Sequence, residues 1–214
     1  MSRLRAVIFD FDGVLIESNA LKTRAFSEVF SRFPDHHDAM MAFHHAHVSA
    51  SRYDKFRHLV AERLRRPHDD PLIGELAVRF ADAVRRSLPS CAWVAGAEAL
   101  LRQLRPHLPL YLASMTPQGE LDEAVAARGL SEVFAGVYGC PPWPKALALG
   151  DIVRREGGAE GVVFVGDSAG DQRAAAEAGL EFLARDSGLA FEPPLPPAFP
   201  DLHAIGAALV DRLA

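Results

Sequence analysis

A short apolar run that ends in two closely spaced carboxylates constrains the fold of this chain more than any other feature. Residues 6–9 are apolar without interruption, and the run is followed by Asp10, Asp12 and Gly13. Such a run is typical of a strand buried on both faces, as in a parallel sheet. Two carboxylates at the end of that strand repel each other unless a positive group lies between them. The segment therefore predicts a buried strand whose end binds a divalent cation, with a simple polar turn as the alternative.

Outside residues 18–88, short apolar runs alternate with amphipathic segments. After the first run, strands are predicted at residues 108–113, 133–138, 162–165 and 182–184. Helices are predicted at residues 96–104, 118–128, 145–156, 171–178 and 204–213. This alternation predicts a doubly wound, Rossmann-like α/β core with a parallel sheet. Residues 192–200 hold five prolines and predict an irregular surface segment.

Residues 18–88 have a different character, because their apolar residues follow helical spacing and no strand pattern is found among them. We expect residues 1–17 and 89–214 to form the α/β catalytic core. Residues 18–88 are then a small all-helical cap domain inserted after the first strand. His44, His45 and His47 are candidate zinc ligands in this insert, but they lack the spacing of a helical ligand pair and solvated positions fit them better.

The composition narrows the class of protein and its partners. The chain has 214 residues, of which 49% are hydrophobic and 24% charged, and this is ordinary for a soluble globular protein. A net charge of −5 favours neither a nucleic-acid surface nor an anionic membrane as partner. No apolar run is long enough to cross a bilayer, and the two cysteines, Cys91 and Cys140, form no disulfide framework. We expect a cytoplasmic protein, either a monomer or a homodimer.

Polar residues follow three of the predicted strands. They are Asp10 with Asp12, then Ser114 with Thr116, then Asp167 with Ser168, and Lys145 begins a predicted helix. Because the carboxyl ends of parallel strands meet at one edge of a sheet, these groups should lie close together. Carboxylates suit Mg²⁺, and a hydroxyl and an ammonium suit phosphate. One carboxylate could then attack phosphorus while the other protonates the departing oxygen and later activates water.

Each position also has a structural alternative. Ser114 could be a polar strand end, Lys145 a solvated helix start, and Asp171 a helix N-cap, a position that aspartate favours. All the positions fall at one predicted edge of the sheet, and this shared location disfavours the structural alternative for each of them.

The motifs resemble those of a known family. The segment Asp10–Leu15, Ser114, Lys145 and the segment Gly166–Asp171 resemble, in order and rough spacing, the four motifs of the haloacid dehalogenase-like hydrolase superfamily. The helical insert resembles the cap of its phosphoglycolate phosphatases and beta-phosphoglucomutases. The resemblance implies an Mg²⁺-dependent phosphohydrolase that cleaves a small-molecule phosphate monoester through an aspartyl-phosphate intermediate. Its partner would be a small phosphorylated metabolite.

The resemblance also implies roles for the acidic residues and the lysine. Asp10 looks like the nucleophile and a metal ligand, and Asp12 like the general acid/base, with its backbone carbonyl on the metal. Asp167 looks like the third metal ligand. Lys145 looks like the charge that steadies the nucleophile and the phosphoryl group, and Asp171 like a supporting carboxylate.

Phosphate and substrate contacts follow in the same way. Ser114 looks like the phosphate-binding hydroxyl, helped by the backbone amide of Met115. In the insert, the segment that runs from Ser49 to Phe56 is similar to cap segments of relatives. Its Arg52 and Lys55 are candidates to hold the leaving group, and ordinary helix-surface charges are the alternative.

Other activities stay open to different degrees. A phosphomutase acting on a sugar phosphate is less expected, because many such relatives carry histidine near position 22, where this chain has Lys22. A dehalogenase is disfavoured, because it does not need the second carboxylate, Asp12, which this chain has. A non-enzymatic receiver that keeps its phosphoryl group is a further alternative, although the long insert and the position of Asp10 disfavour it.

Overall fold

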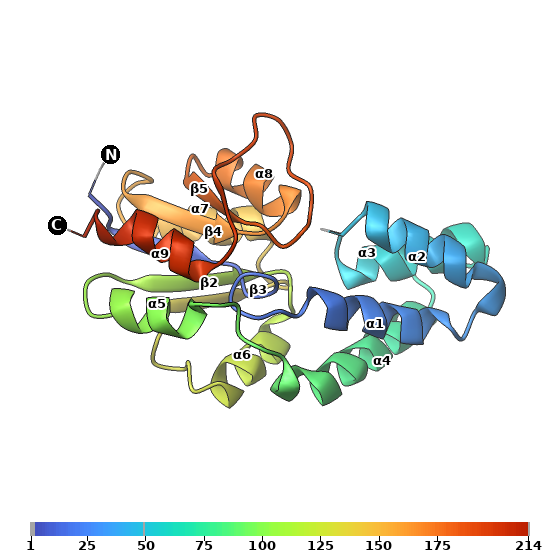
Figure 1. The fold of residues 1–214 in the computed structure, drawn as a ribbon. Coiled ribbons are helices and arrows are strands. Elements are labelled where there is room, and N and C mark those ends of the chain that lie inside the picture. Colours follow the sequence, from blue (N-terminus) through green and yellow to red (C-terminus); the bar gives the residue numbers. More distant parts are fainter. Residues whose placement is uncertain (1–2, 49, 214) are drawn as a thin grey trace. The chain divides into compact units, whose positions relative to one another are not determined.

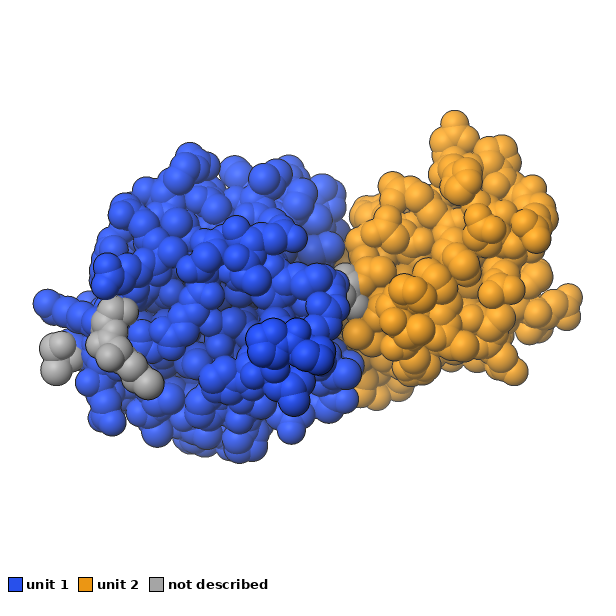
Figure 2. Space-filling view, turned by 90° about the horizontal axis from the view of Figure 1, so that it is seen from above, with its two compact units in different colours: residues 1–17, 92–214 blue, residues 18–91 orange. Residues whose placement is uncertain are grey.

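The computed structural model describes residues 3–48 and 50–213 of the chain. The chain divides into two compact units, which Figure 2 shows in different colours. One unit comprises Met1–Glu17 and Ala92–Ala214, and is called the core unit below. The other comprises Ser18–Cys91 and is called the helical unit.

The core unit is built on a parallel sheet, which confirms the predicted α/β class. The strands are β1 (Ala6–Phe9), β2 (Leu110–Ser114), β3 (Gly136–Gly139), β4 (Val162–Gly166), β5 (Glu181–Arg185) and β6 (Ala198–Phe199). Their order across the sheet is β3-β2-β1-β4-β5-β6, and every neighbouring pair is parallel. All residues of β1, β2 and β4 are buried, as their uninterrupted apolar runs predict.

Two details of the sheet differ from the prediction. The third strand begins at Gly136, later than expected, because Val133 belongs to the turn in which its amide donates to the Leu130 carbonyl at 2.9 Å. The proline-rich stretch is also not wholly irregular. Ala198 and Phe199 pair with the end of β5 and form the short edge strand β6, which two residues of periodicity could not reveal.

The helices of the core unit cover the sheet (Figure 1). They are α5 (Ala97–Leu104), α6 (Gln118–Ala127), α7 (Lys145–Arg155), α8 (Ala169–Glu177) and α9 (Leu202–Val210). Side chains of α7 and α8, among them Leu149, Ile152 and Ala175, pack with Ile8 and Phe164 of the sheet in one buried cluster. Figure 1 shows α5 and α9 side by side. These helices hold the strands whose ends carry the predicted site.

The helical unit has its own core. It contains α1 (Asn19–Phe30), α2 (His37–Ala46), α3 (Arg52–Arg57) with a π-helical continuation (His58–Arg63), and α4 (Leu72–Ser87). No strand lies among the described residues of this unit. Aromatic side chains fill its centre, where the rings of Phe26 and Phe80 lie 4.3 Å apart and the rings of Phe30 and Phe56 meet edge to face at 6.1 Å. The predicted helical stripes are therefore the buried faces of this unit.

None of the helices that the structure describes is both long and apolar enough to cross a membrane.

Candidate active site

Three neighbouring strands bring the predicted residues to one edge of the sheet. In the sheet β1 lies between β2 and β4, and Phe9 is level with Leu112 and Val165. Asp10 follows β1 directly, Ser114 ends β2, and Asp167 follows β4. Because all three strands run in one direction, their polar ends meet at the carboxyl edge.

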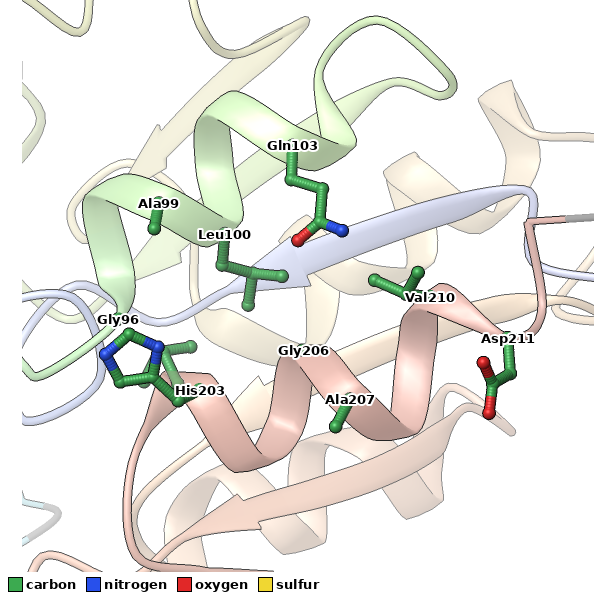
Figure 3. Close-up of a pocket in the computed structure, with 10 residues that line it drawn as sticks. Gly96, Ala99, Leu100, Gln103, His203, Gly206, Ala207, Val210 and Asp211 are labelled. Atoms are coloured by element: carbon green, nitrogen blue, oxygen red, sulfur yellow. The ribbon is translucent and has the colours of Figure 1, made fainter.

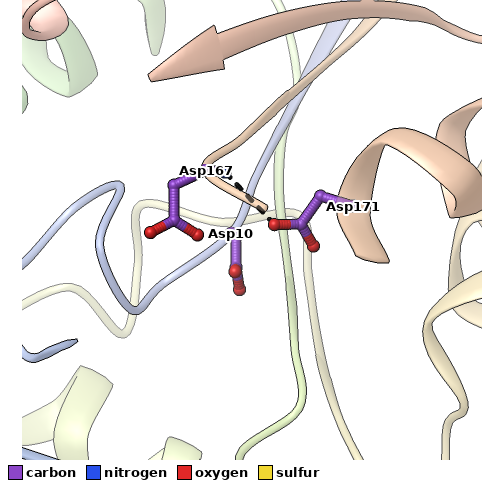
Figure 4. A group of neighbouring side chains, drawn as sticks. All are labelled: Asp10, Asp167 and Asp171. Carbon is purple, nitrogen blue, oxygen red and sulfur yellow. Dashed lines mark hydrogen bonds between the residues drawn. The ribbon is translucent and has the colours of Figure 1, made fainter. Parts of the chain in front are cut away.

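Three carboxylates converge there from two segments that lie far apart in the sequence (Figure 4). Oxygen atoms of Asp10, Asp167 and Asp171 lie within 4.8 Å of one another, and all three residues are buried. That separation is short enough for a single small cation to contact more than one of them. Among the described residues this is the only such group of three candidate metal ligands, and the predicted zinc candidates His44, His45 and His47 form none.

The ammonium of Lys145 lies between two of these carboxylates. Its Nζ atom is 3.1 Å from Oδ2 of Asp10 and donates to Oδ1 of Asp171 at 2.5 Å. Burial lowers the pKa of Lys145, but the charges of Asp10 and Asp171 outweigh that effect and raise the pKa above its usual value. The lysine is therefore a permanent positive charge, and the alternative of a solvated helix start is wrong.

Both carboxylate oxygens of Asp171 already accept hydrogen bonds from other groups of the chain. Its Oδ2 accepts from the backbone amides of Asp167 at 3.1 Å and Ser168 at 3.2 Å, and from the Ser168 hydroxyl at 2.8 Å. Ser168 is the N-cap of α8 and Asp171 the third helical residue, so the two form a capping box. The alternative in which Asp171 itself is the N-cap is therefore corrected. Its other oxygen holds Lys145, so the helix start and the site share one carboxylate.

Gly166, the last residue of β4, makes this arrangement possible. A Cβ atom at this position would overlap the side chain of Asp171, and it would also meet the ring of Phe182. The sequence showed this glycine only as part of a motif. Its physical role, to let the Asp171 side chain approach the strand, depends on a contact between segments.

Two hydroxyl groups hold the second carboxylate of the first motif. Oδ2 of Asp12 accepts from Thr116 Oγ1 at 3.0 Å and from Ser114 Oγ at 3.4 Å. The Thr116 amide donates to Ser114 Oγ at 3.1 Å, so the bend after β2 is closed by the serine side chain. Met115 lies in that bend with 37% of its surface exposed. Thr116 was recognised only as a polar residue at the strand end; its bond to Asp12 was missed.

The electrostatics of the site favour a cation. Burial raises the pKa of Asp10 well above its usual value; Lys145 opposes this, while Asp171, Asp167 and Asp12 raise it further. The site therefore holds four carboxylates and one ammonium, and further positive charge would stabilise the ionised forms of the carboxylates. The available donors are hard carboxylate oxygens, which suit Mg²⁺. The residues thus fit a metal site.

The two predicted substrate contacts lie in the helical unit and are both buried, so the alternative of ordinary surface charges is wrong. Nζ of Lys55 lies 3.1 Å from Nδ1 of His44 and donates to the Val48 carbonyl at 3.2 Å. The guanidinium of Arg52 lies 4.7 Å from the centre of the Phe80 ring. Contact of Arg52 and Lys55 with a substrate stays a prediction, and Ser49, at the start of the same segment, lies outside the described residues.

A hollow lies elsewhere in the core unit, away from the carboxylate cluster. It has a volume of about 340 Å³ and lies between α5 and α9, where Leu100, His203 and Val210 are among its lining residues (Figure 3). None of the residues that line it belongs to the predicted site. The carboxylate cluster is therefore the candidate active site.

Comparisons with known proteins agree with the geometry. Residues 4–179 match the family model of the haloacid dehalogenase-like hydrolases. A phosphoglycolate phosphatase from Synechococcus elongatus is 28% identical over 211 residues, which cover 92% of this chain and 91% of that protein. The resemblance inferred from the motifs is thereby confirmed, and the receiver alternative is wrong.

Solved structures share the fold over almost their whole length. A proposed beta-phosphoglucomutase from Thermotoga maritima superposes with a TM-score of 0.71 at 22% identity and covers 97% of this chain and 99% of its own. A proposed HAD-hydrolase from Bacillus subtilis, YfnB, solved with bound magnesium, superposes with a TM-score of 0.70 at 15% identity, with coverage of 97% and 99%. At these identities the likeness shows the fold alone.

Proposed function

Because the chain belongs to the haloacid dehalogenase-like hydrolase family, we propose that it is a Mg²⁺-dependent phosphatase that cleaves a small phosphate monoester through an aspartyl-phosphate. The family and the phosphoglycolate phosphatase relative support the enzyme class. The single observation that carries the chemistry is the convergence of Asp10, Asp167 and Asp171 within 4.8 Å, with the Lys145 ammonium among them.

In the proposed reaction Asp10 is the nucleophile. One of its carboxylate oxygens forms a bond to phosphorus while the bond between phosphorus and the leaving oxygen breaks. Lys145, 3.1 Å from Oδ2 of Asp10, favours the ionised form of that carboxylate and offsets negative charge on the phosphoryl group, and the positive charge of the proposed metal would act in the same direction. The Ser114 hydroxyl and the Met115 amide are proposed to hold the remaining phosphate oxygens.

Asp12 is the proposed general acid and base. It gives a proton to the leaving oxygen in the first step. In the second step it takes a proton from the water that attacks the aspartyl-phosphate, which releases inorganic phosphate and regenerates Asp10. The hydrogen bond from Thr116 orients its carboxylate for both transfers.

The proposed magnesium ligands are the side chains of Asp10 and Asp167 and the backbone carbonyl of Asp12. When bound, the ion would neutralise phosphate charge and help to align the ester for attack. Asp171 keeps its supporting role, since its two oxygens already hold Lys145 and the start of α8. The magnesium found in the YfnB structure supports this choice of ion.

We assign Ser18–Cys91 as a cap domain and the core unit as the catalytic domain. Substrate choice then falls to the cap, with Arg52 and Lys55 as the proposed contacts to the leaving group. The substrate class is a small phosphorylated metabolite, and 2-phosphoglycolate is the first candidate because of the relative from Synechococcus elongatus.

A panel of phosphate esters, assayed for inorganic phosphate with Mg²⁺ and with EDTA, tests the proposal. The panel includes 2-phosphoglycolate, sugar phosphates and p-nitrophenyl phosphate. We expect repeated turnover that needs Mg²⁺ and falls at least about a thousandfold in Asp10→Asn. Asp122→Asn, which changes an exposed carboxylate on α6, is the matched control and should leave turnover unchanged.

Two results would contradict the proposal. One is turnover by Asp10→Asn that equals that of the unchanged protein. The other is conversion of a sugar phosphate into its isomer without release of phosphate, which would identify a phosphomutase instead.

A further inference from the structure

An arginine that was not among the predicted site residues reaches the loop of the first motif. Arg185 is the last residue of β5. Its Nη1 donates to the carbonyl oxygen of Gly13 at 3.2 Å, and its Nη2 donates to Oε1 of Glu17 at 2.5 Å. Since β4 lies between β1 and β5, this side chain joins two parts of the sheet that do not pair with each other.

The loop that Arg185 holds carries the proposed acid and base. Residues 10–17 leave β1, present Asp10 and Asp12, and turn at Gly13, whose φ is +75°. Thr116 and Ser114 hold the Asp12 carboxylate from the side of β2. Arg185 holds the backbone one residue further along, from the side of β5.

The second contact of Arg185 fixes the far end of the same loop. Glu17 is the last residue of the core unit before the chain enters the helical unit. Its amide donates to the Ala92 carbonyl at 2.9 Å, where the chain returns to the core unit. One guanidinium therefore anchors the loop both beside Asp12 and at its exit.

The side chain of Arg185 is largely buried, and packing holds it in place. Its side chain is 11% exposed, and its Nε atom is buried without a hydrogen-bond partner in the described part of the chain. A buried N–H without a partner costs free energy, so packing holds this guanidinium against its own preference for full solvation. In this position the guanidinium makes its two contacts to the loop, with the Gly13 carbonyl and with Glu17.

We propose that Arg185 is a positioning residue that sets the place of Asp12 through the Gly13 carbonyl and Glu17. This inference rests on the proposed function, in which Asp12 protonates the leaving oxygen. Arg185 itself touches no reacting atom in this scheme. Its removal lets the loop relax, and a proton donor displaced by even about 1 Å loses much of its effect.

The proposal makes a distinctive prediction about leaving groups. A poor leaving group needs a proton as it departs, and a good leaving group does not. Phenyl phosphate and p-nitrophenyl phosphate are similar in shape, but phenolate is the poorer leaving group. The ratio kcat/KM covers only the steps up to loss of the leaving group, so hydrolysis of the aspartyl-phosphate, which is common to both esters, does not enter.

The experiment compares kcat/KM for the two esters in the unchanged protein, Arg185→Gln and Asp12→Asn, each with saturating Mg²⁺. We expect Arg185→Gln to lose about tenfold more activity on phenyl phosphate than on p-nitrophenyl phosphate, in the same direction as Asp12→Asn. Arg212→Gln is the matched control. It breaks the ion pair to Glu181 at the opposite end of β5, with bonds of 2.8 and 2.9 Å, and should show no selectivity between the esters.

Equal losses on both esters in Arg185→Gln would overturn the inference and leave the proposed function intact. Hydrolysis of neither ester by the unchanged protein would count against the proposed function itself. Glu17→Gln, which changes a side chain that is 43% exposed, repeats the test if Arg185→Gln does not fold. A selective loss there supports the inference, and an equal loss or none refutes it.

Discussion

Replacing Lys145 by methionine should lower the stability of the metal-free protein and raise its affinity for magnesium. The Nζ atom lies 3.1 Å from Asp10 and 2.5 Å from Asp171. At an effective dielectric constant of ~20, each attraction is on the order of 5 kcal/mol before the cost of burying the ammonium is subtracted. Removing one partner of a buried ion pair lowers stability by about 3–5 kcal/mol, because the remaining charges are left uncompensated.

Thermal unfolding with and without magnesium measures both effects. In EDTA, the unfolding temperature of Lys145→Met should fall by roughly 10 °C relative to the unchanged protein. Titration calorimetry should show Mg²⁺ affinity higher by about tenfold or more, because a competing positive charge has left the site. Turnover should fall by about a hundredfold or more despite the tighter metal, since the nucleophile has lost its fixed partner.

Arg154→Met provides the matched control on the same helix. Arg154 is 75% exposed and pairs with Asp151 at 2.8 Å, so its loss should change the free energy of unfolding by less than about 1 kcal/mol. If Lys145→Met unfolds at the same temperature as the unchanged protein and binds magnesium no more tightly, the ammonium has no significant electrostatic interaction with the carboxylates. The electrostatic account of the site would then be wrong.

Two further predictions concern the backbone of the site and the helical unit. Gly166→Ala should lower stability by about 1–3 kcal/mol and reduce turnover, because the methyl displaces Asp171; Gly150→Ala, with open space around it, should do neither. Thermal unfolding and the ester panel check both variants. Burial and the charge of Lys55 lower the pKa of His44 from 6.5 to about 4. The folded state thus prefers the neutral ring, and stability should drop by up to ~3 kcal/mol as pH falls from ~6.5 to ~4. Urea unfolding across this range should show a larger drop in the unchanged protein than in His44→Gln, where His58, whose pKa is also lowered by burial, still contributes.

Much of the core architecture could be read from the order of residues. The uninterrupted apolar runs at β1, β2 and β4 predicted strands buried on both faces, and all their residues are buried. The helical spacing of apolar residues in 18–88 predicted amphipathic helices, and Phe26, Phe30 and Phe56 are indeed buried in the core of the helical unit. Periodicity failed where an element was too short to show any, as at Ala198–Phe199.

The residues of the candidate site also fall into two groups, those whose proximity could be predicted from the sequence and those whose contacts could not. The meeting of Asp10, Ser114 and Asp167 could be predicted from the order of residues, because parallel strands place their carboxyl ends at one edge whatever the side chains do. Three other contacts could be found only in the folded chain: Thr116 bonds to Asp12, Lys55 is buried against His44, and Arg185 reaches Gly13 from 172 residues away. Strand direction is a property of the backbone and leaves a periodic trace in the chain. Contacts of this second kind depend on the rotamers and packing of segments brought together by folding, and they leave no local pattern that a single sequence can show.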